Sequence, residues 1–332
     1  MARILKHLKA YVVGGKIELK DIQALAQSRP LAETTATKPE TIGFEPPFRY
    51  LDQSGDPKWI ESYEGYHFGI ITIESRKPKS AEISNALRKR LKELESAATA
   101  EGEEKPTFTR AFMAEERKKI KEELRGKTPP DRKQVYFVFR LELGELWLNT
   151  SVASEYDKVA DFFSSNQIPL QPKPLSMEIE ESLTRILDDP INTLTEDFDL
   201  GSSAHLSESE SNAAANYSNQ DLGSEELKRN LAKDKFVKKL QLVFKDTLTF
   251  SVNSGHCLSN IRYKDSEAQE LTEFDSQEGA EMAYHERLII SIGLELIVAE
   301  RLLREVYKLM TNIDTGSDDI SISSDEISYT DN

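Results

Sequence analysis

The segment from about Glu278 to Met310 carries the strongest helical signal in the sequence. Its apolar residues recur at intervals of three and four positions and form one stripe: Leu288, Ile292, Leu296, Ala299 and Leu303. A stripe of this kind has to be covered by other apolar surface. We therefore expect it to lie in the core or in a dimer interface.

No stretch of the sequence is long and apolar enough to cross a membrane. The longest apolar run, residues 288–298, is interrupted by Ser291, Gly293 and Glu295 and falls short of the ~20 residues that a span needs. The N-terminus carries basic residues but no apolar segment of a secretion signal. The single cysteine, Cys257, cannot form an internal disulfide. We therefore expect a cytoplasmic protein with no membrane partner.

The sequence pattern predicts both strands and helices along the chain. β-Branched and aromatic residues predict strands over residues 4–13, 66–74, 135–141, 145–149, 237–244, 247–252 and 257–263. Apolar periodicity predicts further helices over residues 19–28, 80–98, 111–125, 154–164 and 177–187. Residues 42–48 contain Pro46 and Pro47 and are predicted to form a packed loop.

Composition divides the chain into six parts. They are an N-terminal α+β part (1–75), a basic helical part (76–133), central strands and helices (134–200), a linker (201–224), a C-terminal meander with the long helix (225–312), and an acidic tail (313–332). The linker is rich in Ser, Asn, Ala and Glu and has almost no large apolar residue, which predicts flexibility. The tail is rich in Ser and Asp and is predicted to be disordered.

The charge of the chain is unevenly distributed. The net charge is −15, which taken alone argues against a nucleic-acid partner. Residues 76–133, however, contain 17 Lys and Arg against 11 Asp and Glu, an excess of +6, so the remaining chain carries −21. This asymmetry is compatible with one positive surface on an acidic body.

Basic residues of this region are the first candidates for contacts with DNA phosphates. They are Arg88, Lys89, Arg90, Lys118, Lys119, Lys121, Lys127, Arg132 and Lys133. The alternative is that they form salt bridges on a solvent-exposed face. Glu93 and Glu95 are available to the first cluster, and several glutamates flank Lys119.

The sequence gives little sign of enzymatic chemistry, a cofactor or a metal site. Gly126, Lys127 and Thr128 resemble the end of a phosphate-binding P-loop, but Lys121 occupies the position of the glycine that this motif requires. The five histidines are scattered and lack the spacing of a zinc site. His256 precedes Cys257 in a strand-like segment, so the two side chains point to opposite faces and cannot form a catalytic dyad. We expect no cofactor, no bound metal and no enzymatic activity.

Two other functions remain open. Glu196, Asp197 and Asp199 form the best candidate for the carboxylate cluster that a metal-dependent DNA exonuclease would need. The other alternative is a protein-interaction scaffold without nucleic-acid binding. An assay of duplex binding at low and high salt, with and without Mg²⁺, separates these functions.

Three segments, taken in order, resemble the RdgC family. The first is IGFEPPF with Gly43, Phe44, Pro46 and Pro47, and the second is the strand GIITIESR leading into the basic helix ISNALRKRLKELE. The third is NQDLGSEELKRNLAKDKFVKKLQLVF, in which the matching residues are Gln220, Asp221, Leu222, Ser224, Glu225, Glu226, Lys235, Val237, Lys239 and Leu240. A strand meander and a long final helix complete the resemblance, which covers most of the chain.

The resemblance implies a horseshoe-shaped α+β monomer with antiparallel sheets and long helices. Two copies would form a ring-like homodimer around double-stranded DNA, bind it without sequence specificity and restrain a RecA-type recombinase in the nucleoid. The family segment adds Lys235, Lys238, Lys239 and Gln220 to the expected DNA contacts. Where family members tend to carry a lysine before the Gln-Asp-Leu motif, this chain has Asn219.

Overall fold

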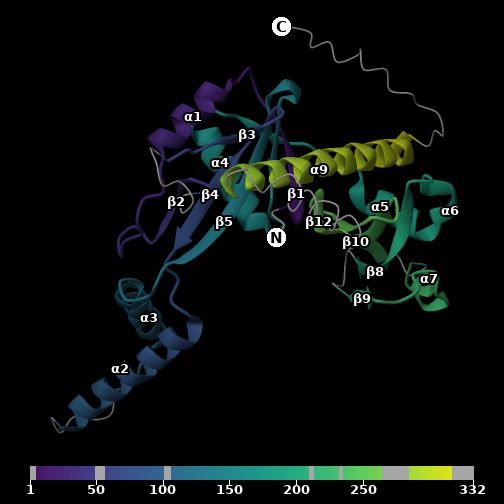
Figure 1. The fold of residues 1–332 in the computed structure, drawn as a ribbon. Coiled ribbons are helices and arrows are strands. Elements are labelled where there is room, and N and C mark those ends of the chain that lie inside the picture. Colours follow the sequence, from purple (N-terminus) through teal and green to yellow (C-terminus); the bar gives the residue numbers. More distant parts are fainter. Residues whose placement is uncertain are drawn as a thin grey trace, which may run out of the picture.

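The computed structural model describes residues 5–48, 57–100, 106–208, 213–231, 235–263 and 284–315 (Figure 1). The strands are β1 (His7–Val13), β2 (Glu40–Glu45), β3 (Glu61–Tyr63), β4 (Tyr66–Ser75), β5 (Asp131–Arg140), β6 (Glu145–Leu148), β7 (Leu170–Pro172), β8 (Phe198–Glu208), β9 (Ala214–Ser218), β10 (Lys235–Phe244), β11 (Leu248–Asn253) and β12 (Cys257–Tyr263). The helices are α1 (Leu19–Ser28), α2 (Ser80–Ala100), α3 (Arg110–Arg125), α4 (Ala153–Ser165), α5 (Ile179–Asp188), α6 (Pro190–Thr193), α7 (Glu225–Leu231) and α9 (Tyr284–Thr315). The described part of the chain is therefore α+β, as the sequence predicts.

The strands form one antiparallel sheet. Its order is β2-β4-β5-β6-β1-β12-β11-β10-β8-β9, with β3 paired to β4 and β7 paired to β1. Strand β1 joins the two halves of the sheet, because its residues 9–12 pair with β6 while His7 and Leu8 pair with β12. The first and last thirds of the chain thus share one continuous sheet.

One face of this sheet packs against α5 and α9. Helix α9 lies across the sheet (Figure 1) and buries Ile292, Leu296, Ala299 and Leu303 in the core. The same core contains Trp147 from β6 and many residues of strands β8–β12. These four residues of the predicted apolar stripe therefore lie in the core.

The opposite face of the sheet is covered in its N-terminal half. There α1 and α4 bury Ile22, Ala26, Val159 and Phe163 against a second core, in which the ring of Phe163 packs edge-on against Phe137. The equivalent face of strands β8–β12 carries mainly polar side chains and forms an open groove. This difference between the two halves positions the candidate site.

Helices α2 and α3 form a hairpin between β4 and β5 that projects away from the sheet (Figure 1). Ile83 and Ile120 are its buried apolar residues, and the Thr109 hydroxyl caps α3 by accepting a hydrogen bond from the Phe112 backbone amide at 3.2 Å. No helix of the described residues combines the length and apolarity that a membrane span requires.

Two segments differ from the sequence prediction. Residues 40–45, part of which we predicted as a loop, form strand β2, because Pro46 and Pro47 lie just beyond the strand and β2 is an edge strand paired only with β4 on the sheet path. The prediction that residues 201–224 form a flexible linker is wrong for the residues of this range that the structure describes. They form most of β8 and all of β9, because Ala204, Leu206 and Tyr217 face the core while the adjacent His205 and Asn216 are polar.

The predicted boundary of the acidic tail at residue 313 is also wrong. Helix α9 continues to Thr315, and Ile313 is buried, with its carbonyl oxygen 2.6 Å from Nη1 of Arg185. The remainder of the predicted tail lies outside the described residues.

Candidate nucleic-acid interface

The uncovered face of strands β8–β12 forms a polar groove of about 460 Å³, here called the open sheet face. Its lining residues are Ser203, Ala204, His205, Asn216, Tyr217, Ser218, Asn219, Lys239, Gln241, Ser251, Asn260 and Arg262. None of these twelve residues carries a carboxylate. The groove therefore offers hydrogen-bond donors and positive charge to a ligand.

Strand alternation explains why Lys239, Gln241 and Arg262 share one face. Leu240 and Leu242 of β10 point into the core, so Lys239 and Gln241 point outward. In β12, Ile261 and Tyr263 point inward and leave Arg262 on the outer face.

Gln241 is held in place within the open sheet face. Its Oε1 accepts a hydrogen bond from the Ser202 amide at 2.9 Å. A Cβ atom at Gly201 would lie 2.6 Å from Cγ of Gln241, so only glycine allows this close approach.

Lys239 and Arg262 supply the charge of the open sheet face. Among the described residues, neither of them forms an ion pair with a carboxylate. Burial lowers the pKa of the nearby His7, and the charges of Lys239 and Lys6 lower it further. Two unpaired cations beside neutral donors form a surface that suits phosphate oxygens.

The structure separates the three lysines predicted on β10. The Lys235 ammonium lies 2.8 Å from Oδ1 of Asn230, and the Lys238 ammonium lies 2.5 Å from the Glu180 carboxylate of α5. The pairing of β10 with β8 shifts register between Val237 and Lys239, and Lys239 therefore points to the open sheet face. It is the one lysine of the three that lines the groove.

The predicted Gln220 lies beside this groove. The backbone amide of Gln220 donates a hydrogen bond to the Ser202 carbonyl at 3.1 Å, and the neighbouring Asn219 lines the open sheet face. Asn219 has a φ of 55°, a backbone conformation that asparagine tolerates better than most residues. The open sheet face therefore includes Lys239 from the predicted set and has Gln220 next to it.

Several predicted contacts on the helical hairpin hold its two helices together. Arg90 of α2 pairs with Glu116 at 2.8 Å and with Glu123 at 3.0 Å, both on α3. Lys119 pairs with Glu115 and Glu116 within α3. Lys119 therefore pairs with glutamates that flank it, as the salt-bridge alternative expects, whereas Arg90 pairs across the hairpin and not with Glu93 or Glu95. Arg88 and Lys89 are exposed, and Lys89 lies 3.9 Å from Glu93.

Lys118 and Lys121 lie in a second positive region at the root of the hairpin, here called the basic cleft. The cleft has a volume of about 850 Å³ and is lined by Pro39, Glu40, Arg76, Lys77, Pro78, Ser80, Ile83, Ala114, Arg117, Lys118, Lys121 and Arg125. Sequence reasoning missed the four other cations, Arg76, Lys77, Arg117 and Arg125. The four-residue spacing of Arg117, Lys121 and Arg125 was the available signal.

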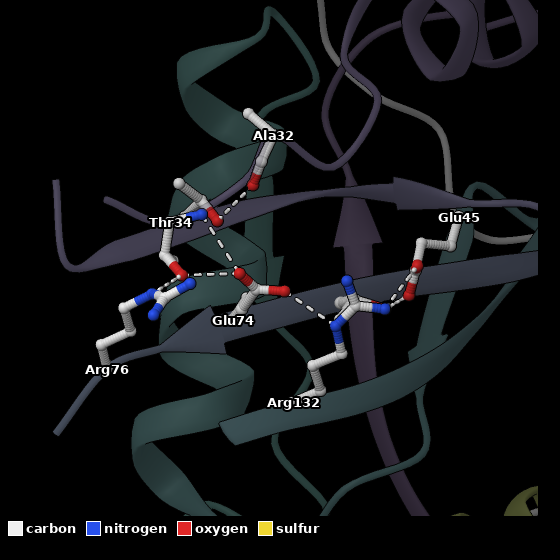
Figure 2. A network of polar contacts seen from close by, with 8 residues as sticks. Ala32, Thr34, Glu45, Glu74, Arg76 and Arg132 are labelled. Carbon is white, nitrogen blue, oxygen red and sulfur yellow. Dashed lines mark hydrogen bonds and ion pairs between the residues drawn. The ribbon is translucent and has the colours of Figure 1, made fainter. Parts of the chain in front are cut away.

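Arg132 belongs to a polar network between β2, β4 and β5 (Figure 2). Its Nε donates to Glu74 at 2.7 Å, and its Nη1 lies 3.5 Å from Glu45. Burial would raise the pKa of Glu74, but hydrogen bonds from Thr34 and Arg132 outweigh it and hold that pKa below its ordinary value. The predicted DNA contact at Arg132 is thus engaged with two carboxylates of the fold. Lys133 lies 3.9 Å from Asp131, and Lys127 is exposed.

The groups considered for catalysis are not gathered into one site. Within the described ranges, no three His, Cys, Asp or Glu side chains are arranged to hold a metal ion. The Asp197 carboxylate lies 3.1 Å from the Lys245 ammonium. Nδ1 of His256 accepts a hydrogen bond from the Leu175 amide, and burial raises the pKa of the adjacent Cys257 thiol to about 11.

Comparison with protein-family models matches residues 4–308 to the family described as "Putative exonuclease, RdgC". Comparison with curated proteins finds no match. The family match covers nearly the whole chain and includes the open sheet face, the basic cleft and α9 through residue 308. The chain therefore belongs to the RdgC family.

Proposed function

We propose that the protein binds double-stranded DNA through the open sheet face, with little preference for base sequence. It encircles the duplex as a homodimer and modulates RecA-type homologous recombination, and it has no catalytic activity of its own. The observation that carries this proposal is the position of Lys239 and Arg262 in a groove whose twelve lining residues include no carboxylate.

The chemistry of the groove favours the DNA backbone over the bases. Lysine and arginine neutralise phosphates, and serine, asparagine and glutamine side chains donate hydrogen bonds to phosphate oxygens. A sheet surface of this kind inserts no helix into the major groove, where base sequence is read. Binding should therefore depend strongly on salt and weakly on sequence.

A homodimer suits this chemistry because each protomer contributes few cations. Two copies related by a twofold axis double the positive surface, and a closed ring keeps both copies on the duplex. The acidic remainder of the chain then lies away from the phosphates and does not oppose binding.

Retention on circular DNA tests encirclement. The same plasmid is prepared as a nicked circle and as a linear molecule, and bound protein is washed with rising salt. We expect the protein to remain on the circle at a salt concentration that strips it from the linear form. Large protein blocks at both ends of the linear form should restore retention. Equal loss from all three forms would contradict encirclement.

The same samples test the nuclease alternative. Duplexes labelled at either end are incubated with the protein and Mg²⁺ or Mn²⁺. Under the proposal the DNA stays intact while it is bound. If the labelled strand becomes shorter, and if this activity co-purifies with the protein, the chain has an exonuclease activity.

Modulation of recombination is tested with a purified RecA-type recombinase in a strand-exchange reaction. Protein in excess over the duplex sites should inhibit exchange, because bound duplex is withheld from the recombinase. Lys239→Glu should inhibit less at equal concentration. Equal inhibition by this variant would indicate contact with the recombinase in place of competition for DNA.

A further inference from the structure

The basic cleft has features of a ligand site that the proposed DNA surface does not use. Ala114, Arg117, Lys118, Lys121 and Arg125 all line it. Their spacings of three and four residues place them on one face of α3. Cations spaced four residues apart repel each other along a helix, so this stripe destabilises α3 unless an anion neutralises it.

Helix α3 sorts its charges between two faces. Glu116 and Glu123 face α2 and pair with Arg90. The cations of α3 that face the cleft are Arg117, Lys118, Lys121 and Arg125. Within the part of the chain that the structure describes, none of these four forms an ion pair with a carboxylate. Three of the acidic residues of α3, Glu115, Glu116 and Glu123, are therefore engaged with Arg90 or Lys119 and not with the stripe.

The other wall of the basic cleft is held rigidly by Arg76. Its Nε donates to the Thr34 hydroxyl at 2.9 Å, and its Nη1 donates to the Thr128 carbonyl at 3.0 Å. Thr34 in turn donates to the buried Glu74, as Figure 2 shows. Arg76 precedes α2 and Thr128 follows α3, so the Arg76–Thr128 bond connects the two ends of the hairpin.

The single carboxylate in the cleft is already neutralised. Glu40 lies 2.6 Å from the Lys158 ammonium and 3.5 Å from that of Lys77. Ser80, the first residue of α2, also lines the cleft, so the positive end of that helix dipole lies at its wall. The electrostatic potential in the cleft is therefore strongly positive.

We propose that the basic cleft binds the linked phosphates of a small oligophosphate, such as tripolyphosphate or a nucleoside triphosphate. Its volume of about 850 Å³ falls in the range of small-molecule sites. Several cations on one helix face match closely spaced phosphate charges. Pro39 and Pro78 add an apolar wall that can contact a nucleobase. This site is independent of DNA binding by the open sheet face.

Isothermal titration and thermal unfolding with tripolyphosphate test the proposal. We expect saturable binding to the full-length protein, a rise in Tm and weaker binding of inorganic phosphate. The double variant Lys118→Gln/Lys121→Gln should weaken tripolyphosphate binding at least tenfold. It should remain folded, because it removes repulsion along α3. The matched control is Lys239→Gln/Arg262→Gln, which removes the same charge from the open sheet face and should leave tripolyphosphate binding unchanged.

The outcomes separate this proposal from the proposed DNA function. If Lys118→Gln/Lys121→Gln loses duplex binding but keeps tripolyphosphate binding, the proposal is overturned and the cleft belongs to the DNA surface. Absence of saturable binding, or equal weakening by both double variants, would overturn it as well. Equal affinity for tripolyphosphate and a nucleoside triphosphate would support recognition of the phosphate chain alone. Tighter binding of the nucleotide would support a contact with its base.

Discussion

Arg90 of α2 lies 2.8 Å from the buried carboxylate of Glu116 on α3, so a residue that looks like a DNA contact in the sequence instead joins the two helices of the hairpin. The Glu123 carboxylate lies 3.0 Å from Nη1 of the same guanidinium. The two carboxylates hold the pKa of Arg90 above its ordinary value, led by the hydrogen bond to Glu123. The hairpin is therefore fixed by charge as well as by Ile83 and Ile120.

Replacement of Arg90 tests this structural role. In Arg90→Gln the Glu116 carboxylate loses its interhelical partner, so α2 and α3 should exchange their amide hydrogens faster. The salt dependence of duplex binding should stay unchanged. The matched control is Lys89→Gln, because Lys89 is exposed and makes only a 3.9 Å pair with Glu93. A shallower salt dependence in Arg90→Gln would assign Arg90 to the DNA surface.

Leu206 tests the assignment of residues 201–208 to the sheet. Its side chain is fully buried in the core, so Leu206→Ala should lower the free energy of unfolding by about 2–5 kcal/mol. Ile191→Ala serves as the control. Because Ile191 is 89% exposed, its replacement should change the free energy of unfolding little. Chemical denaturation measures both. A negligible cost for Leu206→Ala would restore the linker interpretation.

Glu300 links α9 to the sheet. Its carboxylate lies 2.8 Å from Nε of Arg140, accepts a hydrogen bond from the Tyr66 hydroxyl at 2.8 Å and also pairs with Arg304. Glu300→Gln removes the negative charge that pairs with the mostly buried Arg140 and should cost roughly 3 kcal/mol at neutral pH.

The cost of Glu300→Gln should depend on pH. Burial raises the pKa of Glu300, but hydrogen bonds from Arg304 and Tyr66 and the charge of Arg140 outweigh it, so the net pKa is lowered. Stabilisation from a lowered pKa is complete above the ordinary glutamate pKa and is lost as the pH falls through the lowered pKa. The difference between wild type and variant should therefore shrink from about pH 6 to about pH 3 in urea denaturation curves. A difference that is constant with pH would contradict this assignment.

Two truncations locate the end of the folded chain. Removal of the residues after Thr315 should leave the free energy of unfolding unchanged, because that acidic segment has little apolar surface to bury. Duplex affinity should stay equal or rise. Removal of the residues after Asn312 also deletes the buried Ile313 and the carbonyl that Arg185 contacts, and should cost about 2 kcal/mol. Equal stability of the two truncated proteins would contradict a folded C-terminus at Ile313.

The sequence predicts elements whose apolar pattern is dense. Helix α1 has the predicted bounds because Ile22 and Ala26 recur at helical spacing, and α2 begins at the predicted Ser80. Strands β8 and β9 were missed because one face is polar and the other buries only a few residues, such as Ala204 and Leu206. Such a strand has the same composition as a linker, and only its pairing with β10 distinguishes it.

The candidate site was predicted in part for the same reason. Lys239 follows from the family segment, but the register shift that turns Lys238 toward Glu180 cannot be read from the sequence. Arg262 has a usable signal, because the buried Ile261 and Tyr263 on either side of it imply an outward-facing side chain. The family match suggests an association with DNA and recombination but does not say which cations line the surface.

The most direct test of DNA binding by the open sheet face is the salt dependence of duplex affinity in two single variants. Lys239→Gln removes a cation from the groove, and Lys238→Gln removes the neighbouring lysine that pairs with Glu180. Each phosphate contact contributes about 0.9 to the slope of log K against log salt, and the proposed homodimer would lose two contacts. We predict that the slope falls by about two units in Lys239→Gln for duplexes of unrelated sequence and stays at the wild-type value in Lys238→Gln. Equal slopes in both variants and the wild type would contradict the account.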